Sequence, residues 1–413
     1  SSVFWVTLGI AGIMYGLIYL GAPLIGDFYA MPDIVAPLRI LALMLFPGAM
    51  NSIQLAKVSR ELDFKKVFYS NIGGIVVAGV AGIAVAYMDG GLWALVVQNI
   101  LNTAVACVVM WFTVKWRIRL VCNLRRVTEL FRFGWKLLVS ALLDTLYQDL
   151  SSLVIGKIYD SGTLGYYNRG KQFPQFIINA VNGAVQSVML PAMSAEQDDR
   201  EKVKNMMRSS MTMSAYIIFP IMAGLAAVAT PLVSLLLTDK WLPCVPYMQV
   251  YCFSLAFYPV HSCNLQAINA MGRSDLFLKL EIIKKSYGIV FLAIAVFCFD
   301  SPLAIASIEL FAFWIGWFVN SFPNKKLISY SYKEQMFDLF PILFMALCMC
   351  GLVVMVGKWC QSAGMLTILM MLIQILFGVA VYLLLSFIIK PPPYCAVIKA
   401  IEGFLRKKTD MSD

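Results

Sequence analysis

The sequence predicts an all-α polytopic membrane protein, because its composition and its hydropathy pattern both exclude an ordinary soluble domain. Of its 413 residues, 60% are hydrophobic and 14% are charged, and the mean hydropathy is +0.77. A membrane-spanning helix needs about 20 mostly apolar residues. Stretches of this kind predict twelve spans, at residues 3–24, 34–56, 67–88, 92–114, 135–157, 171–193, 209–229, 244–268, 283–299, 302–322, 339–357 and 365–389.

The net charge of +10 is explained by membrane topology. If the first residue is cytoplasmic, 27 of the 33 lysines and arginines fall in cytoplasmic segments. This is the positive-inside pattern, so we expect both termini in the cytoplasm and no nucleic-acid partner. Most of the ten cysteines lie in predicted spans and the chain has one histidine. We therefore expect no structural disulfide, no metal site and no cofactor.

A weak internal repeat predicts two lobes of the same orientation. Sliding the sequence by about 212 positions superposes an ordered series of residues with similar span boundaries. The aligned pairs are Asp27 with Asp239, Pro47 with Pro259, Gln54 with Gln266 and, at an offset of 211, Gln98 with Glu309. The second copy begins near Gly134, so we expect two further helices before Ser1 and fourteen in the complete protein. An even number of helices per copy relates the copies by an axis along the membrane normal.

The repeat and the charge pattern divide the chain into five segments. We expect 1–114 to be the remainder of an N-terminal lobe (helices 3–6) and 115–133 to be a basic, amphipathic cytoplasmic linker. Residues 134–325 are expected to form the C-terminal lobe (helices 7–12), residues 326–390 an appended helix pair (13–14), and residues 391–413 a cytoplasmic tail.

The apolar hairpin at residues 134–193 carries polar side chains at helical spacing. Its first segment has Ser140, Asp144, Gln148 and Ser151 on one face, which Asp149 widens; its second has Gln175, Asn179, Asn182 and Gln186. Such groups are costly in hydrocarbon, so we expect them to face a water-filled cavity or a partner helix. We interpret the hairpin as one wall of a polar passage. For the carboxamides, hydrogen bonding between helices is the alternative.

Several ionisable residues inside predicted spans have more than one interpretation. Arg39 would contact a phosphate or carboxylate, or extend to the headgroups. Asp144 lies roughly 15 Å into its span, where it would be a coupling site, a partner for Arg39 or an internally bonded carboxylate. Glu309 would be a coupling site or a protonated acid facing lipid. For His261, a packing role is favoured over proton transfer.

Arg169 and Lys171 come just before the second segment of the hairpin, after Tyr166 and Tyr167. The two cations would receive anionic groups at the outer mouth of the passage. We assign the two tyrosines to an interfacial aromatic belt.

Several longer runs resemble one family of transporters. The run DLSSLVIGKIYDSGTLGYYNRGKQFPQFIINAVNGAVQSVMLPAMS, with AEQDDREKVK after it, resembles the Wzx-type polysaccharide flippases, most closely their colanic-acid-exporter-like branch. LIGDFYAMPDIVAPLRILAL and QLAKVSRELDFKK are similar to the third and fourth helices of that family and the loop after them. The resemblance implies the multidrug/oligosaccharidyl-lipid/polysaccharide exporter fold, in which two six-helix lobes surround a central cavity.

The resemblance also implies a transporter and not an enzyme. Its cargo would be an undecaprenyl-pyrophosphate-linked oligosaccharide, moved by alternating access across a bacterial inner membrane for surface polysaccharide export. Besides this cargo and membrane lipids, a polysaccharide polymerase and its chain-length machinery are candidate partners. A cation-coupled multidrug efflux pump of the same fold is the alternative. The candidate pathway residues are Arg39, Asp144, Gln148, Asp149, Arg169, Lys171, Asn179, Asn182 and Gln186, and the candidate coupling residues are Asp144, Glu309 and His261.

Overall fold

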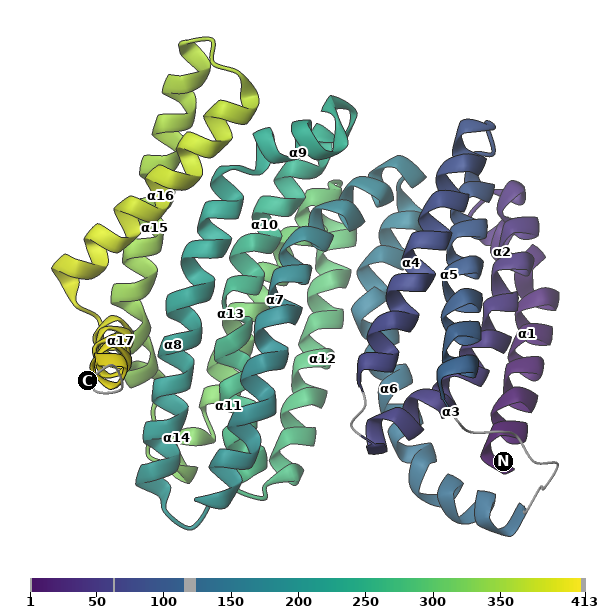
Figure 1. Cartoon of the computed structure of the whole chain (residues 1–413), viewed down its shortest axis with the longest axis horizontal. Coiled ribbons are helices and arrows are strands. Elements are labelled where there is room, and N and C mark those ends of the chain that lie inside the picture. The colour runs from purple at the N-terminus through teal and green to yellow at the C-terminus, as the bar shows by residue number, and fades with distance from the viewer. Residues whose placement is uncertain (1, 62–63, 115–123, 410–413) are drawn as a thin grey trace. The chain divides into compact units, whose positions relative to one another are not determined.

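The computed structural model describes residues 2–61, 64–114 and 124–409, and all regular structure within them is helical (Figure 1). The chain forms two compact units, Ser1–Leu146 and Tyr147–Asp413. The predicted all-α class is confirmed. Among the described residues, eight helical segments are long and apolar enough to cross a membrane. The count of twelve spans and the internal repeat stay predictions.

The first unit is built from α1 (Ser2–Phe28), α2 (Val35–Leu41), α3 (Leu45–Glu61), α4 (Phe64–Tyr87) and α5 (Leu92–Thr113), with short 3-10 turns at Pro32–Ile34 and Ala42–Met44. Residues 115–123 of the predicted linker lie outside the described residues. The helix α6 (Leu124–Ile158) contains the rest of that segment and continues through the first half of the polar hairpin.

Small residues bring α4 and α5 together. Ser70, Gly74, Ala78 and Gly82 recur every four residues, so they form one stripe along α4. A Cβ atom on Gly74 would lie 2.8 Å from the backbone oxygen of Asn102, which shows how closely the two backbones approach. The hydroxyl of Ser70 donates to the carbonyl of Ala106 at 2.7 Å. This is the close packing that small residues permit between apolar helices.

The second unit contains the remaining helices, which Figure 1 shows in teal to yellow. They are α7 (Ser161–Ala195), α8 (Arg200–Ala227), α9 (Ala229–Leu237), α10 (Val245–Ala256), α11 (Tyr258–Ala270), α12 (Ser274–Cys298), α13 (Pro302–Ser321), α14 (Asn324–Leu327), α15 (Tyr332–Ser362), α16 (Thr367–Ile389) and α17 (Pro392–Thr409), with a 3-10 turn at Asp239–Cys244.

Side-chain caps begin three of these helices, because the first N–H groups of a helix lack partners within it. Asp160 accepts from the backbone N–H of Thr163 and begins α7. Asp199 accepts from the backbone of Glu201 and Lys202 and begins α8. Ser331 and Glu334 form a reciprocal capping box at the start of α15.

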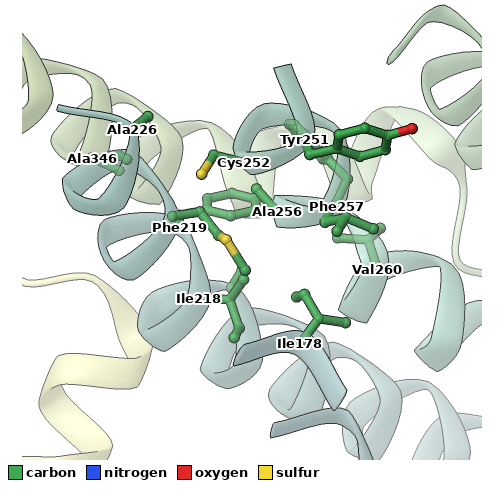
Figure 2. Close-up of a cluster of buried hydrophobic side chains, with 14 of the residues drawn as sticks. Ile178, Ile218, Phe219, Ala226, Tyr251, Cys252, Ala256, Phe257, Val260 and Ala346 are labelled. Atoms are coloured by element: carbon green, nitrogen blue, oxygen red, sulfur yellow. The ribbon is translucent and has the colours of Figure 1, made fainter. Parts of the chain in front are cut away.

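The core of the second unit lies where α7, α8, α10, α11, α13 and α15 pack together. Figure 2 shows part of it, with Phe219 and Phe257 in its centre and Tyr251 at its edge. The ring of Phe257 lies 5.1 Å from that of Phe219 and 4.7 Å from that of Trp314. Close approach of α7 to α10 depends on Gly170, where a Cβ atom would lie 2.9 Å from the backbone nitrogen of Met248.

Helices α15 and α16 pack against α8 within this unit. The hydroxyl of Tyr216 on α8 donates to Ser386 on α16 at 2.9 Å, and Tyr382 donates to the carbonyl of Tyr216 at 2.9 Å. The buried amide of Gln374 covers Gly357 and donates to the carbonyl of Val353. Polar contacts of this kind hold apolar helices together where no water competes.

Candidate functional site

The polar residues of the predicted passage wall lie on α6 and α7. The side chains of Asp144, Gln148 and Asp149 are exposed on α6. On α7, Asn179 is exposed and accepts a hydrogen bond from the amide of Gln175 at 2.9 Å.

Two further carboxamides of the predicted stripe lie in the second half of α7. The Oδ1 atom of Asn182 is buried without a hydrogen-bond partner. Gln186 also lies in α7, and its side chain is outside the described part of the structure. An unpaired buried carboxamide oxygen is costly, so the position of Asn182 is suited to a polar ligand or to water.

A hydrogen-bonded chain of two tyrosines and a glutamate lies inside the second unit. The hydroxyl of Tyr251 on α10 donates to the hydroxyl of Tyr167 on α7 at 2.5 Å. Tyr167 in turn donates to Oε1 of Glu309 on α13 at 3.1 Å. Both tyrosines are fully buried and Glu309 is half-buried. This arrangement places two ordered phenol groups beside the carboxylate of Glu309.

This hydrogen-bonded chain corrects the prediction for Tyr167 and favours one of the two interpretations of Glu309. The predicted place of Tyr167 in an interfacial aromatic belt is wrong, because its side chain has 0% exposure and bonds to Glu309. The alternative in which Glu309 only faces lipid does not account for its bond to Tyr167. Tyr166, by contrast, is half-buried and packs edge-on against Trp241, with ring centroids 5.8 Å apart.

The cations of α7 lie against aromatic rings near this chain. Lys171 places its Nζ atom 5.5 Å from the ring centre of Tyr251. Arg169 lies 5.4 Å above the ring of Trp241 and donates to Oε1 of Gln172 at 2.7 Å. Aromatic faces stabilise cations in this geometry while leaving other donors available to an anion. The site therefore combines one carboxylate with two cations held by aromatic rings.

His261 of α11 forms a separate buried pair with Asn320 of α13. Its Nδ1 atom is 3.2 Å from the amide nitrogen of Asn320, and its ring packs edge-on against Phe313. The side chain is 8% exposed, and its Nε2 atom has no hydrogen-bond partner. A Cβ atom on Gly316 would lie 3.1 Å from the ring, so α11 and α13 approach closely here. These contacts define a packed histidine with one unpaired nitrogen.

In the first unit, Arg39 is held by Tyr19. Its Nε atom donates to the carbonyl of Tyr19 at 3.1 Å, and its guanidinium lies 4.2 Å from the centre of the Tyr19 ring. The side chain is half-buried. The other guanidinium nitrogens remain as donors for a planar anion.

A buried carboxamide network was not predicted from the sequence. Gln335 of α15 exchanges hydrogen bonds of 3.0 and 3.1 Å with Asn264 of α11. Its oxygen also accepts from the indole of Trp317 at 3.0 Å, and Asn324 donates to Asn264 at 2.8 Å. The two asparagines and Gln335 have 0% exposure. The sequence shows that these polar residues lie in or beside apolar segments, but it does not show which of them are partners.

The chain was compared with known proteins. The profile of a family described as polysaccharide biosynthesis protein matches residues 1–246. The teichuronic acid biosynthesis protein TuaB of Bacillus subtilis is 25% identical over 279 residues, which are 67% of this chain and 58% of that protein. The lipopolysaccharide biosynthesis protein WzxC of Escherichia coli is 24% identical over 358 residues, 84% of this chain and 71% of that protein.

A solved structure has the same fold. The lipid II flippase MurJ in an inward closed conformation superposes with a TM-score of 0.76 at 17% identity, over 96% of this chain and 84% of that chain. The chain thus has the fold of that exporter, while it spans 58% of the length of the curated relative TuaB.

Proposed function

This chain belongs to the polysaccharide biosynthesis protein family, and from that membership we propose that it moves a lipid-linked oligosaccharide across a bacterial inner membrane for export of surface polysaccharide. The carrier lipid would be undecaprenyl pyrophosphate, and alternating access of two lobes would be the mechanism. The observation that carries the proposal is the family match over residues 1–246, together with relatives named for the biosynthesis of two different surface polysaccharides.

The cargo requires both cationic and polar uncharged contacts. A pyrophosphate brings negative charge to a region with little water, and guanidinium groups bind phosphate oxygens well. We assign this role to Arg39, Arg169 and Lys171, each of which lies against an aromatic ring. Sugar hydroxyls would be met by the stripes on α6 and α7, formed by Asp144, Gln148, Asp149, Asn179, Asn182 and Gln186.

Coupling to an ion gradient is assigned to Glu309. A carboxylate among tyrosine hydroxyls can take up a proton or a cation without a large rearrangement, because the donors are already ordered. Asp144 and His261 are the alternative coupling residues, and His261 is the less suited because it is packed against Phe313 and paired with Asn320. Both termini are proposed to be cytoplasmic, with a polysaccharide polymerase as a protein partner.

A lipid analysis of cells deleted for the gene tests the proposed cargo. We expect undecaprenyl-pyrophosphate oligosaccharide to accumulate on the cytoplasmic leaflet while surface polysaccharide is lost, and the gene in trans should restore both. Unchanged lipid-linked intermediates with raised sensitivity to cationic drugs would instead support a multidrug efflux pump.

Residue roles are tested in the same cells. Glu309→Gln removes the charge but keeps an acceptor for Tyr167, so it should abolish coupled transport while the protein still folds. Asn179→Leu should reduce transport by removing a sugar contact. Gln361→Leu is the matched control, because Gln361 is exposed near the end of α15 and outside the proposed pathway. Full transport by the Glu309→Gln variant would contradict the assigned coupling role.

A further inference from the structure

A polar cavity of about 460 Å³ lies at the end of the second unit where α8 and α15 both begin. Arg200, Glu201, Lys204, Asn205 and Arg208 line it from α8, and Ile328 and Ser329 line it from the loop after α14. The volume is many times that of a water molecule, which occupies roughly 30 Å³. It can therefore hold a tetrahedral anion with part of its hydration shell.

The three cations of this cavity are stacked along one face of α8. Arg200, Lys204 and Arg208 are four residues apart, so each lies one turn from the next. Like charges at this spacing repel each other. Anions beside a stack of three therefore stabilise it.

Helix α15 supplies anions for two of the three cations. Lys204 is 3.1 Å from Glu334, and Arg208 pairs with Asp338. In each pair the two residues are 130 positions apart, so α8 and α15 run parallel here with a constant register. The same spacing would place residue 330 beside Arg200, but Tyr330 precedes α15 and its hydroxyl donates to Asp338. Helix α15 therefore has no carboxylate opposite Arg200, which lies one turn before Lys204 on α8.

The bonded cations keep donors that face the cavity. Lys204 donates to the carbonyl of Ser329 at 2.7 Å and to Glu334, while the Arg208 side chain is 53% exposed although it is paired. A guanidinium has five N–H donors in a planar fork that matches phosphate oxygens. The lining itself has three basic side chains, those of Arg200, Lys204 and Arg208, and one acidic side chain, that of Glu201. The excess positive charge favours an anionic ligand.

The position of the cavity along α8 and α15 indicates the source of the anionic ligand. Segments Arg200–Ala227 and Tyr332–Ser362 are both apolar enough to cross a membrane, and the cavity lies at the end where both begin. When the two segments span a membrane, this end lies at the level of the lipid headgroups. Just beyond it, α15 exposes Phe337, Phe340 and Phe344, and the rings of the last two are stacked 6.4 Å apart. These rings offer an apolar surface to acyl chains.

We propose that this cavity binds the phosphate headgroup of an anionic membrane phospholipid, held by Arg200 and Arg208. The bound phosphate would lie beside Arg200, which has no carboxylate opposite it on α15, and would join α8 to the loop before α15. A free phosphate or pyrophosphate has the same charge chemistry, and the experiment separates these sources.

Native mass spectrometry of the detergent-solubilised protein, with equimolar phosphatidylglycerol and phosphatidylcholine, tests the proposal. We expect preferential retention of phosphatidylglycerol. Arg200→Gln should lower this retention about five-fold, since one basic residue near an anionic surface contributes about 1 kcal/mol. Asn205→Asp should lower it also, because it places a carboxylate in the cavity without breaking an ion pair. Lys202→Gln is the control: Lys202 pairs with Glu196 and is not part of the cavity lining.

Three results would overturn the proposal. Equal retention of the two lipids would remove the preference for an anionic headgroup. An equal loss in the Lys202→Gln control would reduce the effect to general surface charge. Displacement of the lipid by inorganic phosphate or pyrophosphate at the same concentration would assign the cavity to a free anion. Unchanged melting temperatures of the variants exclude unfolding as the cause of lost binding.

Discussion

The hydroxyl of Tyr167 donates a hydrogen bond of 3.1 Å to Oε1 of Glu309, although 142 positions separate the two residues in the chain. The bond joins α7 to α13, and Tyr251 of α10 extends it by donating to Tyr167. A carboxylate in an apolar environment is stabilised by ordered donors. This relationship links the packing of the second unit to the residue that we propose for coupling.

Tyr167→Phe is expected to weaken both stability and transport. The substitution removes the hydroxyl that bonds to both Tyr251 and Glu309. The loss of a buried hydrogen-bond partner costs about 1–3 kcal/mol of unfolding free energy. Chemical unfolding in detergent and the lipid assay measure the two effects. Tyr166→Phe is the matched control, because the neighbouring Tyr166 ring packs on Trp241 and would be retained. Equal losses in the two variants would contradict a specific role for the Tyr167–Glu309 bond.

Gln335→Leu is expected to destabilise the second unit. The change removes the acceptor of the indole N–H of Trp317 and two hydrogen bonds of Asn264, which keeps those to Val260 and Asn324. An unpaired donor in this fully buried region costs about 1–3 kcal/mol. Limited proteolysis and thermal unfolding should detect the loss. Gln361→Leu changes the same residue type at an exposed position of the same helix and should have little effect. A Gln335→Leu variant as stable as this control would show that the network contributes nothing net.

Gly74→Ala is expected to destabilise the first unit by about 1–3 kcal/mol, the usual cost of overpacking. The new Cβ atom would lie 2.6 Å from Oδ1 of Asn102 and 2.8 Å from its backbone oxygen, and the backbone cannot move aside easily. Gly79→Ala on the same helix has no atom within 4 Å of the new Cβ and should be neutral or slightly stabilising. Thermal unfolding of the two variants should rank them in this order, and the reverse order would refute the close α4–α5 packing.

The cap of α7 should contribute to the pH dependence of stability. Hydrogen bonds from the side chain and the backbone of Thr163 lower the pKa of Asp160 below its usual range. Because the folded-state pKa is the lower one, the stabilisation is present above the unfolded pKa of about 3.9. It is lost as the pH falls through the folded value.

Asp160→Asn keeps the cap but removes this titration. The difference in melting temperature between wild type and Asp160→Asn should therefore change as the pH falls below about 4. Asp198→Asn, at an exposed aspartate in the turn before α8, is the control. A difference that stays constant down to the lowest pH at which the protein is soluble would contradict the assigned cap titration.

The fold class could be predicted from the sequence because it depends on local composition. Long apolar segments must form helices in a bilayer, where each backbone group needs a partner within its own segment. Several helix starts are also local, since Asp160 and Ser331 bond to N–H groups three residues ahead. The same reasoning identified Glu309 as a residue of interest, because a carboxylate in a span is costly wherever that span lies.

The partners of these residues depended on tertiary structure alone. Helical phase indicates which residues share a face, but it does not indicate which helix that face meets. Tyr167 therefore looked like an interfacial tyrosine until α7 was placed against α10 and α13. The Gln335 network and the parallel register of α8 and α15 likewise join residues 71 and 130 positions apart. Composition determined which segments are apolar enough to form helices in a membrane. Side-chain packing between distant helices decided which polar groups meet.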